Sequence, residues 1–408
     1  MVVIFSVLSS SLSHGIKSKI KKQNIEKATE INWKTEFETL KVLINNLMEL
    51  ADESSQTSIE QIGETFDNII ELNSVLINRN VLNTILKTTI NQFAGSVEPE
   101  SDLENIINKI KQSIDANQTL SYKQELTALN SLFNEITNID TSTMNFEQFG
   151  RLLDSYDETN GTMKSVVVSA IRPDIVLMVI NKLDTSSFDP EMIEIVNEIK
   201  NNVQNIISYQ TELKKLDEFV SEVENLKTID INTFNFEGFG EMLDGFNDSV
   251  LLSSIRSNVL TFIVDKVEIE SNEAEINSAI SDILNNTKQL GNQAEQGTIL
   301  FKTIFKEIGS LKTELDKFGN ITFTKDNYNV SGFGTLIKNL DDLNIVPTIA
   351  SVRIAKCVTG KIIGPNGFKS LIPDYSSSPY KDAIDEVYNQ AMAKFEEGME
   401  LSKKCNEI

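Results

Sequence analysis

The chain has 408 residues, which is long enough for two or three ordinary domains with substantial hydrophobic cores. A composition of 40% hydrophobic and 24% charged residues is close to the globular average, and it excludes a disordered chain and a membrane bundle. The 60 Asp and Glu residues outnumber the 37 Lys and Arg residues, and the formal net charge of -23 argues against a nucleic-acid partner because it repels phosphate. With only 7 prolines and 18 glycines, the chain favours helices over a turn-rich β-sandwich.

The N-terminal residues, the apolar stretches and the cysteines bear on the compartment of the protein. The apolar start, Met1 to Leu8, has no basic residue before it and no clear cleavage site, which argues against a signal peptide. No stretch reaches the roughly 18 to 20 apolar residues of a bilayer span. Two cysteines, Cys357 and Cys405, cannot form a disulfide framework, so a cytoplasmic location, or one within an assembled particle, is favoured over secretion.

A nine-residue motif recurs along the chain and organises the predicted elements. Its copies are Ile59–Asp67, which is degenerate, Phe146–Asp154, Phe236–Asp244 and Val330–Lys338. The motif glycines at positions 63, 150, 240 and 334 are separated by 87, 90 and 94 residues. Since the flanking segments repeat in step, this spacing predicts tandem units of about 90 residues.

Each predicted unit contains four helices in the same order. An amphipathic first helix, as at Tyr122 to Ile136, precedes the motif, which opens the second helix. The third helix is apolar nearly all round, as in Ile171–Leu183 and Ile255–Val267, and we expect it to be buried. Asp189-Pro190 and Ser378-Pro379 predict starts of fourth helices, with proline at the first helical position.

The unit boundaries follow from these patterns in chain order. The prediction is a partial unit at 1–32, then repeats at 33–120, 121–207, 208–297 and 298–408, the last of them ending in a capping helix over Tyr380 to Leu401. Residues 1–12 are strongly apolar, so we expect them to be buried against the first unit or against another chain.

The aromatic residues and glycine of the motif allow two interpretations. Glycine can bring a backbone close to a bound ligand, so a ligand loop is one of them. The other is that the aromatics anchor the second helix in the core while glycine permits close helix packing. Recurrence in every unit favours the structural interpretation and predicts that Phe149, Phe239 and Phe333 are buried.

The motif aspartates Asp67, Asp154 and Asp244 raise the possibility of metal binding or acid–base chemistry. They are about 90 residues apart and are expected on successive units, whereas a site needs its ligands within a few ångström. Lys338 breaks the series in the fourth copy. The sequence therefore favours a solvent-facing or backbone-bonding role for these side chains.

Other candidate sites are weaker. Lys361–Lys369 contains a Gly-x-x-Gly loop of the kind with which KH domains clamp RNA, but the repeat alignment makes Gly364 and Pro365 the stop signal of a third helix. The single histidine, His14, removes His-based triads and paired-His zinc sites. Cys357 is expected to be a small buried hydrophobe and Cys405 to be exposed.

The sequence thus predicts an all-α fold, an elongated α-solenoid-like array of about four and a half tandem four-helix repeats. It predicts no catalytic, cofactor-binding or metal residue and no cofactor. The expected function is a non-enzymatic structural or scaffold protein, for example in a phage or viral particle, that contacts other proteins or copies of itself. The alternative is a helical-repeat adaptor that binds peptide segments of partner proteins, and an enzyme with unrecognised catalytic carboxylates is the third.

Overall fold

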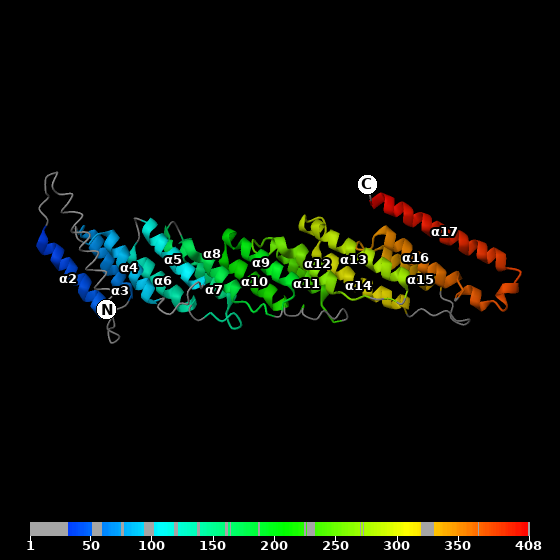
Figure 1. The fold of residues 1–408 in the computed structure, drawn as a ribbon, viewed down its shortest axis with the longest axis horizontal. Coiled ribbons are helices and arrows are strands. Elements are labelled where there is room, and N and C mark those ends of the chain that lie inside the picture. The colour runs from blue at the N-terminus through cyan, green and yellow to red at the C-terminus, as the bar shows by residue number, and fades with distance from the viewer. Residues whose placement is uncertain are drawn as a thin grey trace. The chain divides into compact units, whose positions relative to one another are not determined.

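The computed structural model describes residues 32–50, 59–74, 77–93, 102–117, 121–136, 139–159, 162–163, 165–186, 188–223, 226, 233–269, 271, 273–319, 330–365 and 367–406. Within these ranges the chain is all-α, with sixteen α-helices and one antiparallel pair of two-residue strands, β1 (Glu158–Thr159) and β2 (Thr162–Met163) (Figure 1). The predictions for the partial unit at 1–32, for His14 and for burial of residues 1–12 lie outside the described residues.

The α-helices follow one another along the chain with short connections. They are α2 (Trp33–Leu50), α3 (Ile59–Glu71), α4 (Arg79–Phe93), α5 (Asp102–Ala116), α6 (Tyr122–Ile136), α7 (Phe146–Asp154), α8 (Val166–Asn181), α9 (Pro190–Asn202), α10 (Tyr209–Val223), α11 (Phe236–Gly245), α12 (Arg256–Lys266), α13 (Ala274–Glu295), α14 (Phe301–Gly319), α15 (Val330–Asp341), α16 (Thr348–Ile363) and α17 (Lys381–Asn406). Short 3-10 turns are η1 (Val203–Asn205), η3 (Ser253–Ile255), η4 (Phe368–Leu371) and η5 (Tyr375–Ser377). All four motif copies lie in helices, namely α3, α7, α11 and α15.

The chain divides into two compact units. The first comprises the described residues up to Asp184 together with Lys200–Lys214, and in it α3 packs on α6 and α5 packs on α8. The second comprises Thr185–Ile199 and the described residues from Lys215 onward, and in it α11 packs on α14, α13 on α16, and α16 on α17. In both units the contacts join helices that are neighbours or near neighbours in the chain.

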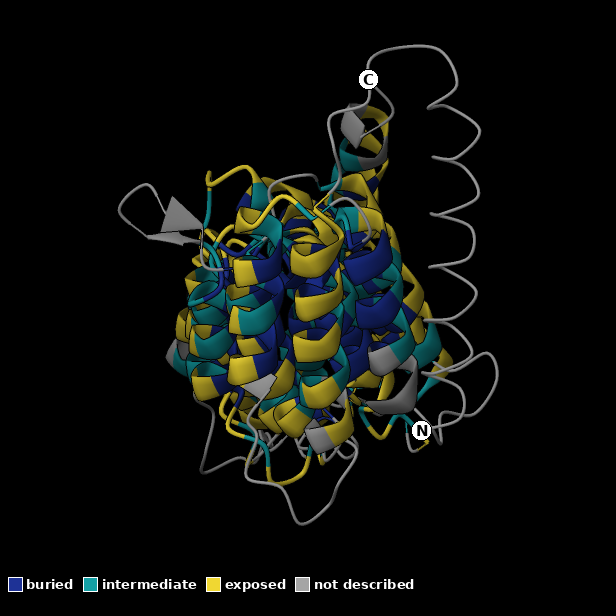
Figure 2. Ribbon diagram, turned by 90° about the vertical axis from the view of Figure 1, so that its left-hand side faces the viewer, coloured by how far each residue is buried: buried dark blue, intermediate teal, exposed yellow. Residues whose placement is uncertain are grey.

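The third helices α8 and α12 are largely buried, as their apolar composition predicts. Nine of the 16 residues of α8 and six of the 11 residues of α12 are buried. Figure 2 shows helices whose buried residues face inward and whose exposed residues face outward. In α16, by contrast, only Ile349, Ala350, Ile354 and Val358 are buried. Cys357, expected to be a small buried hydrophobe, is half-buried, because this face of α16 is only partly covered. Burial still raises the pKa of that thiol to about 11.

A buried glutamate fixes the start of α8. Glu125 of α6 is 3% exposed and accepts hydrogen bonds from the backbone N–H groups of Val166 and Val167, at 2.8 and 3.1 Å, and from the Ser165 hydroxyl. Ser165 is itself the N-cap, since its Oγ accepts from the Val168 N–H at 3.0 Å. Burial raises the pKa of Glu125, and these hydrogen bonds oppose the rise. The carboxylate supplies acceptors to helix-start donors that the buried backbone would otherwise leave unpaired.

Three helix boundaries test the sequence signals directly. Helix α9 begins at Pro190, as predicted, and α16 ends at Ile363, where the Gly364 N–H donates to the Gly360 carbonyl at 2.8 Å. The predicted start of α17 at Pro379 is wrong. That helix begins at Lys381, and in the turn before it the Ser378 hydroxyl accepts a hydrogen bond from the Tyr380 N–H.

A charged cluster holds the start of α17 against η4 and η5. The Asp385 carboxylate accepts hydrogen bonds from Lys369, Tyr375 and Lys381 at 2.6 to 2.8 Å. These donors hold the pKa of Asp385 well below its usual range. The helix they anchor is only partly covered: Met399 is buried, whereas Val387 is 57% exposed.

Candidate functional site

The motif glycines of α3, α7 and α11 lie where another helix begins. A Cβ atom on any of the three would come within 3.0 Å of backbone atoms of Lys123 in α6, of Tyr209 in α10, or of Lys302 in α14, respectively. Real Cβ atoms do not approach a backbone so closely, so only glycine permits these crossings. The predicted role of the glycine in close helix packing is therefore confirmed for these three copies.

The motif aspartates cap the helices that begin there. Asp67 Oδ1 accepts from the Tyr122 N–H at 2.8 Å, and its Oδ2 accepts from the Lys123 N–H at 3.0 Å. The same pair of bonds recurs from Asp154 to Tyr209 and Gln210, and from Asp244 to Phe301 and Lys302, all at 2.8 or 2.9 Å. A carboxylate at a helix N-terminus satisfies unpaired N–H groups and interacts favourably with the helix dipole. The backbone-bonding role predicted for these aspartates is confirmed.

An arginine that was not predicted from the sequence completes each of these contacts. The first ring of each capped helix is buried, with Tyr122, Tyr209 and Phe301 at 0%, 3% and 0% exposure. Over these rings lie Arg79, Arg172 and Arg256, at 5.5, 4.7 and 5.2 Å from the ring centroids. Such cation–π contacts favour one position of the guanidinium over the ring. The available signal was the arginine in each of the apolar segments Ile171–Leu183 and Ile255–Val267; Arg79 lies in α4, which is rich in polar residues and gave no such signal.

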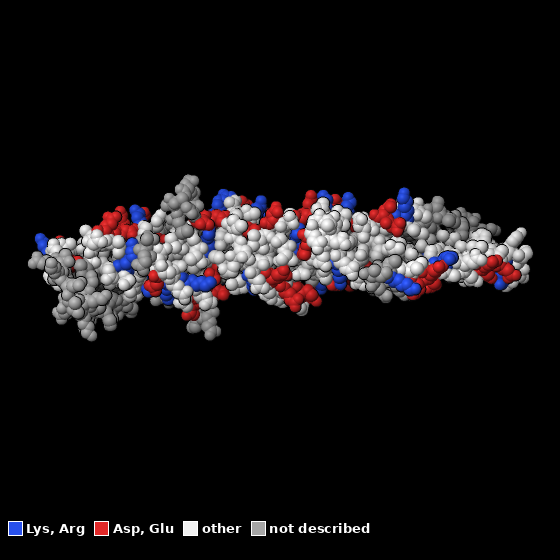
Figure 3. Space-filling model, turned by 90° about the horizontal axis from the view of Figure 1, so that it is seen from above, with Lys and Arg blue, Asp and Glu red and all other residues white. Residues whose placement is uncertain are grey.

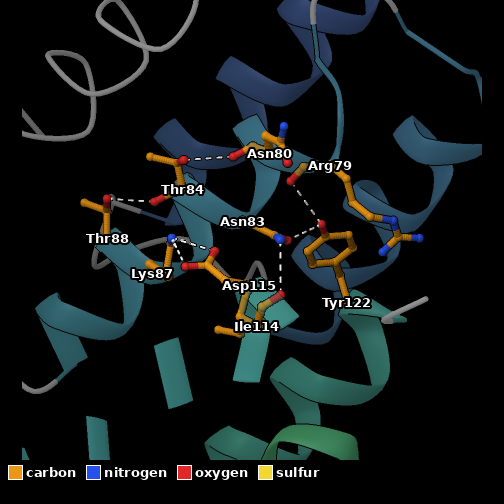
Figure 4. Close-up of polar contacts among 9 residues, drawn as sticks. All are labelled: Arg79, Asn80, Asn83, Thr84, Lys87, Thr88, Ile114, Asp115 and Tyr122. Carbon is orange, nitrogen blue, oxygen red and sulfur yellow. Dashed lines mark hydrogen bonds and ion pairs between the residues drawn. The ribbon is translucent and has the colours of Figure 1, made fainter. Parts of the chain in front are cut away.

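We call each set of glycine, aspartate, aromatic ring and arginine a joint. The first, second and third joints contain Gly63, Gly150 and Gly240. Figure 4 shows the surroundings of the first joint, where the Tyr122 hydroxyl donates to Asn83 Oδ1 at 2.6 Å. The Asn83 amide in turn donates to the Ile114 carbonyl at 3.2 Å, which links α4, α5 and α6. Burial raises the pKa of Tyr122 to about 12. This tyrosine is a neutral hydrogen-bonded member of the core.

The fourth motif copy departs from this pattern. Gly334 is exposed, and apart from its chain neighbours and its own helix backbone, no atom of the described residues lies within 4 Å of the position that a Cβ would take there. Lys338, also exposed, stands in place of the aspartate. Arg353 of α16 pairs with Glu275 and Asp282 of α13. In the part of the chain that the structure describes, the fourth copy thus presents a glycine and a lysine at the surface where the first three copies hold a helix start.

The burial predicted for the motif phenylalanines is confirmed for two of them. Phe149 is 6% exposed and Phe239 is 4% exposed. The Phe239 ring contacts those of Phe234 and Phe305, each at 5.5 Å between centroids. The side chain of Phe333 lies outside the described residues.

Removal of one cap should measure its contribution. We expect Asp244→Ala to lower the free energy of unfolding by about 1 to 2 kcal/mol, because two N–H groups at the start of α14 lose their acceptors. The matched control is Lys338→Ala at the equivalent, exposed position of α15, which should change stability by less than about 0.5 kcal/mol. Urea denaturation followed by circular dichroism measures both, and equal effects of the two substitutions would show that the cap contributes nothing.

Two grooves open beside the joints, on the other side of the motif helices. The larger, of about 730 Å³, is the α10–α11 groove, lined by Asp217, Glu218, Ser221, Glu222, Thr233, Phe234, Asn235, Gly238, Phe239 and Met242. The smaller, of about 330 Å³, is the α6–α7 groove, lined by Glu135, Ile139, Asp140, Thr143, Met144, Asn145, Gln148, Phe149 and Leu152. Neither groove could be predicted from the sequence, because a groove depends on how two helices pack.

The two grooves are built by equivalent residues. Asn145 and Asn235 are the N-caps of α7 and α11, and their side chains accept from the Gln148 and Gly238 N–H groups at 2.9 and 3.0 Å. The buried motif phenylalanine follows in each case. Because the cap fixes where the helix begins, the third, fourth and seventh positions of the motif line each groove.

No protein-family model, curated protein or solved structure matches this chain significantly. Within the described part of the chain, no helix combines the length and apolarity needed to cross a membrane. The same residues contain no group of three or more His, Cys, Asp or Glu placed to hold a metal ion. The motif aspartates, which the sequence raised as possible metal ligands, lie in three separate joints.

Proposed function

We propose that the chain is a non-enzymatic scaffold or structural protein that acts through protein–protein contacts. The observation that carries the proposal is the joint, because the same glycine, aspartate, ring and arginine contacts occur at three places in the chain. A residue pattern that repeats along a chain and joins helices each time is typical of repeat architecture.

The proposed architecture is a tandem array of four-helix units that stack into an elongated, α-solenoid-like form. The units are α2–α5, α6–α9, α10–α13 and α14–α17, which correspond to the predicted repeats at 33–120, 121–207, 208–297 and 298–408. In each of the first three repeats, the motif helix contacts the start of the first helix of the next repeat. Such an array offers the same surface several times at a fixed spacing, which suits a component of a large assembly such as a phage or viral particle.

The proposed partners are other proteins or further copies of this chain, in the cytoplasm or within an assembled particle. The net charge of -23 opposes binding to nucleic acid through long-range repulsion. An adaptor that binds peptide segments is the second candidate. It is favoured by the α10–α11 and α6–α7 grooves, whose equivalent residues repeat a concave surface of peptide size.

The mass of the purified chain in solution separates the two candidates. We expect light scattering across a range of concentrations to give assemblies well above the 45.7 kDa of one chain. A monomer at all concentrations would contradict the self-assembling scaffold and favour the adaptor. Submicromolar binding to DNA or RNA at physiological salt would overturn both.

A further inference from the structure

The α10–α11 groove combines an apolar floor with an acidic wall. Phe234, Phe239 and Met242 form the floor, on which Phe239 is buried while the other two are half-buried. Asp217, Glu218 and Glu222 project from α10 along one side, and none of the described residues that line the groove is a lysine or an arginine. Asp217 is exposed, and partial desolvation raises the pKa of its carboxyl.

The α6–α7 groove has the same design at equivalent positions. Phe149 is buried, and Met144 and Leu152 are half-buried, just as Phe239, Phe234 and Met242 are. Its acidic residues are Glu135 and Asp140, and its described lining likewise holds no lysine or arginine. Where the smaller groove is lined by the side chain of Gln148, the larger has Gly238, which carries no side chain.

The surface around the grooves does not explain their acidity. Acidic and basic side chains both occur on the face in Figure 3. Elsewhere in the second compact unit, opposite charges form ion pairs, such as that of Lys302 with Glu237. The charged residues of the described groove linings, by contrast, are all acids. The lining therefore selects for a positively charged occupant. A segment rich in lysine or arginine fits this lining better than the chain's own surface does, because in the chain 60 acidic residues outnumber 37 basic ones.

We propose that the α10–α11 groove binds a peptide segment of another protein in which an apolar side chain is flanked by lysine or arginine. The apolar side chain packs on Phe234 and Met242, and the flanking cations pair with Asp217 and Glu218. The α6–α7 groove binds the same class of segment more weakly because it is smaller and has fewer acids. This inference rests on the proposed protein-binding function and names the chemistry of the partner.

The test uses a fluorescently labelled peptide, Lys-Lys-Leu-Phe-Lys-Lys, and the full chain, with binding followed by fluorescence anisotropy. We expect saturable binding that weakens by about tenfold or more in the double variant Asp217→Lys, Glu218→Lys, because two attractive charges become repulsive. Glu268→Lys is the control, an exposed charge reversal in the same unit that does not line the groove. It should change the affinity less than about twofold. The peptides Glu-Glu-Leu-Phe-Glu-Glu and Lys-Lys-Ser-Ser-Lys-Lys should bind at least tenfold more weakly.

Two outcomes overturn the groove proposal. One is the absence of binding to the lysine peptide. The other is equal loss in the groove variant and in Glu268→Lys, which would mean general attraction to an acidic protein. Circular dichroism of each variant confirms that it is folded, and Asp217→Asn, Glu218→Gln replaces the double variant if charge reversal prevents folding. Light scattering tests the scaffold function separately from the groove proposal. If the chain forms assemblies but does not bind the peptide, only the groove proposal is wrong.

Discussion

Replacing Gly240 with alanine is expected to lower the free energy of unfolding by about 3 kcal/mol. The new Cβ would lie 2.7 Å from the Lys302 Cα and 2.8 Å from the Phe301 carbonyl oxygen. Both are backbone atoms of α14, so no side-chain rotation relieves the overlap and the two helices must move apart. The displacement also lengthens the Asp244 hydrogen bonds to the start of α14. Urea denaturation followed by far-UV circular dichroism measures the change.

The same substitution at the fourth motif copy is a control, for which the expected change in stability has the opposite sign. Gly334 is exposed in α15, and a Cβ at this position would meet none of the described residues within 4 Å. Alanine there gains helix propensity without a clash, so Gly334→Ala should raise stability by about 0.5 to 1 kcal/mol. If Gly240→Ala and Gly334→Ala shift stability in the same direction, the close helix crossing at Gly240 is wrong.

Truncation of Phe239 to alanine should lower the free energy of unfolding by about 3 to 5 kcal/mol. The ring is 4% exposed and contacts Phe234 and Phe305, so its removal leaves a cavity between α11 and α14. Phe368→Ala is the matched control, because that ring is 40% exposed and should lose far less. A thermal melt of Phe239→Ala that equals that of the parent would instead favour an exposed aromatic row as a partner surface.

The sequence was sufficient for those features that depend on local pattern. Apolar spacing predicted an all-α chain, a proline marked the start of α9, and recurrence singled out the glycines and aspartates of the motif. It could not show what Asp244 binds, because its partners Phe301 and Lys302 lie 57 and 58 residues further along the chain. The preference for a backbone partner followed from side-chain chemistry, whereas the choice of helix follows from tertiary packing.

The features that could not be predicted from the sequence also depend on tertiary packing. Arg172 reads as one polar residue in an apolar helix, and only packing shows the Tyr209 ring 4.7 Å from its guanidinium. The half-burial of Cys357 likewise depends on how much of α16 its neighbours cover. At the start of α17 the local signal failed, since Ser378 and Pro379 lie in a turn before the helix, which begins at Lys381.

Each joint divides its hydrogen-bonding groups between helices that are distant in sequence. Asp154 gains its partners only when α10 is helical, and the first N–H groups of α10 are capped only when α7 is in place. Loss of one helix therefore leaves the other with unpaired polar groups and an exposed ring. The joints couple the folding of adjacent segments, so that neighbouring helices gain and lose structure together although they are separated by more than fifty residues of chain.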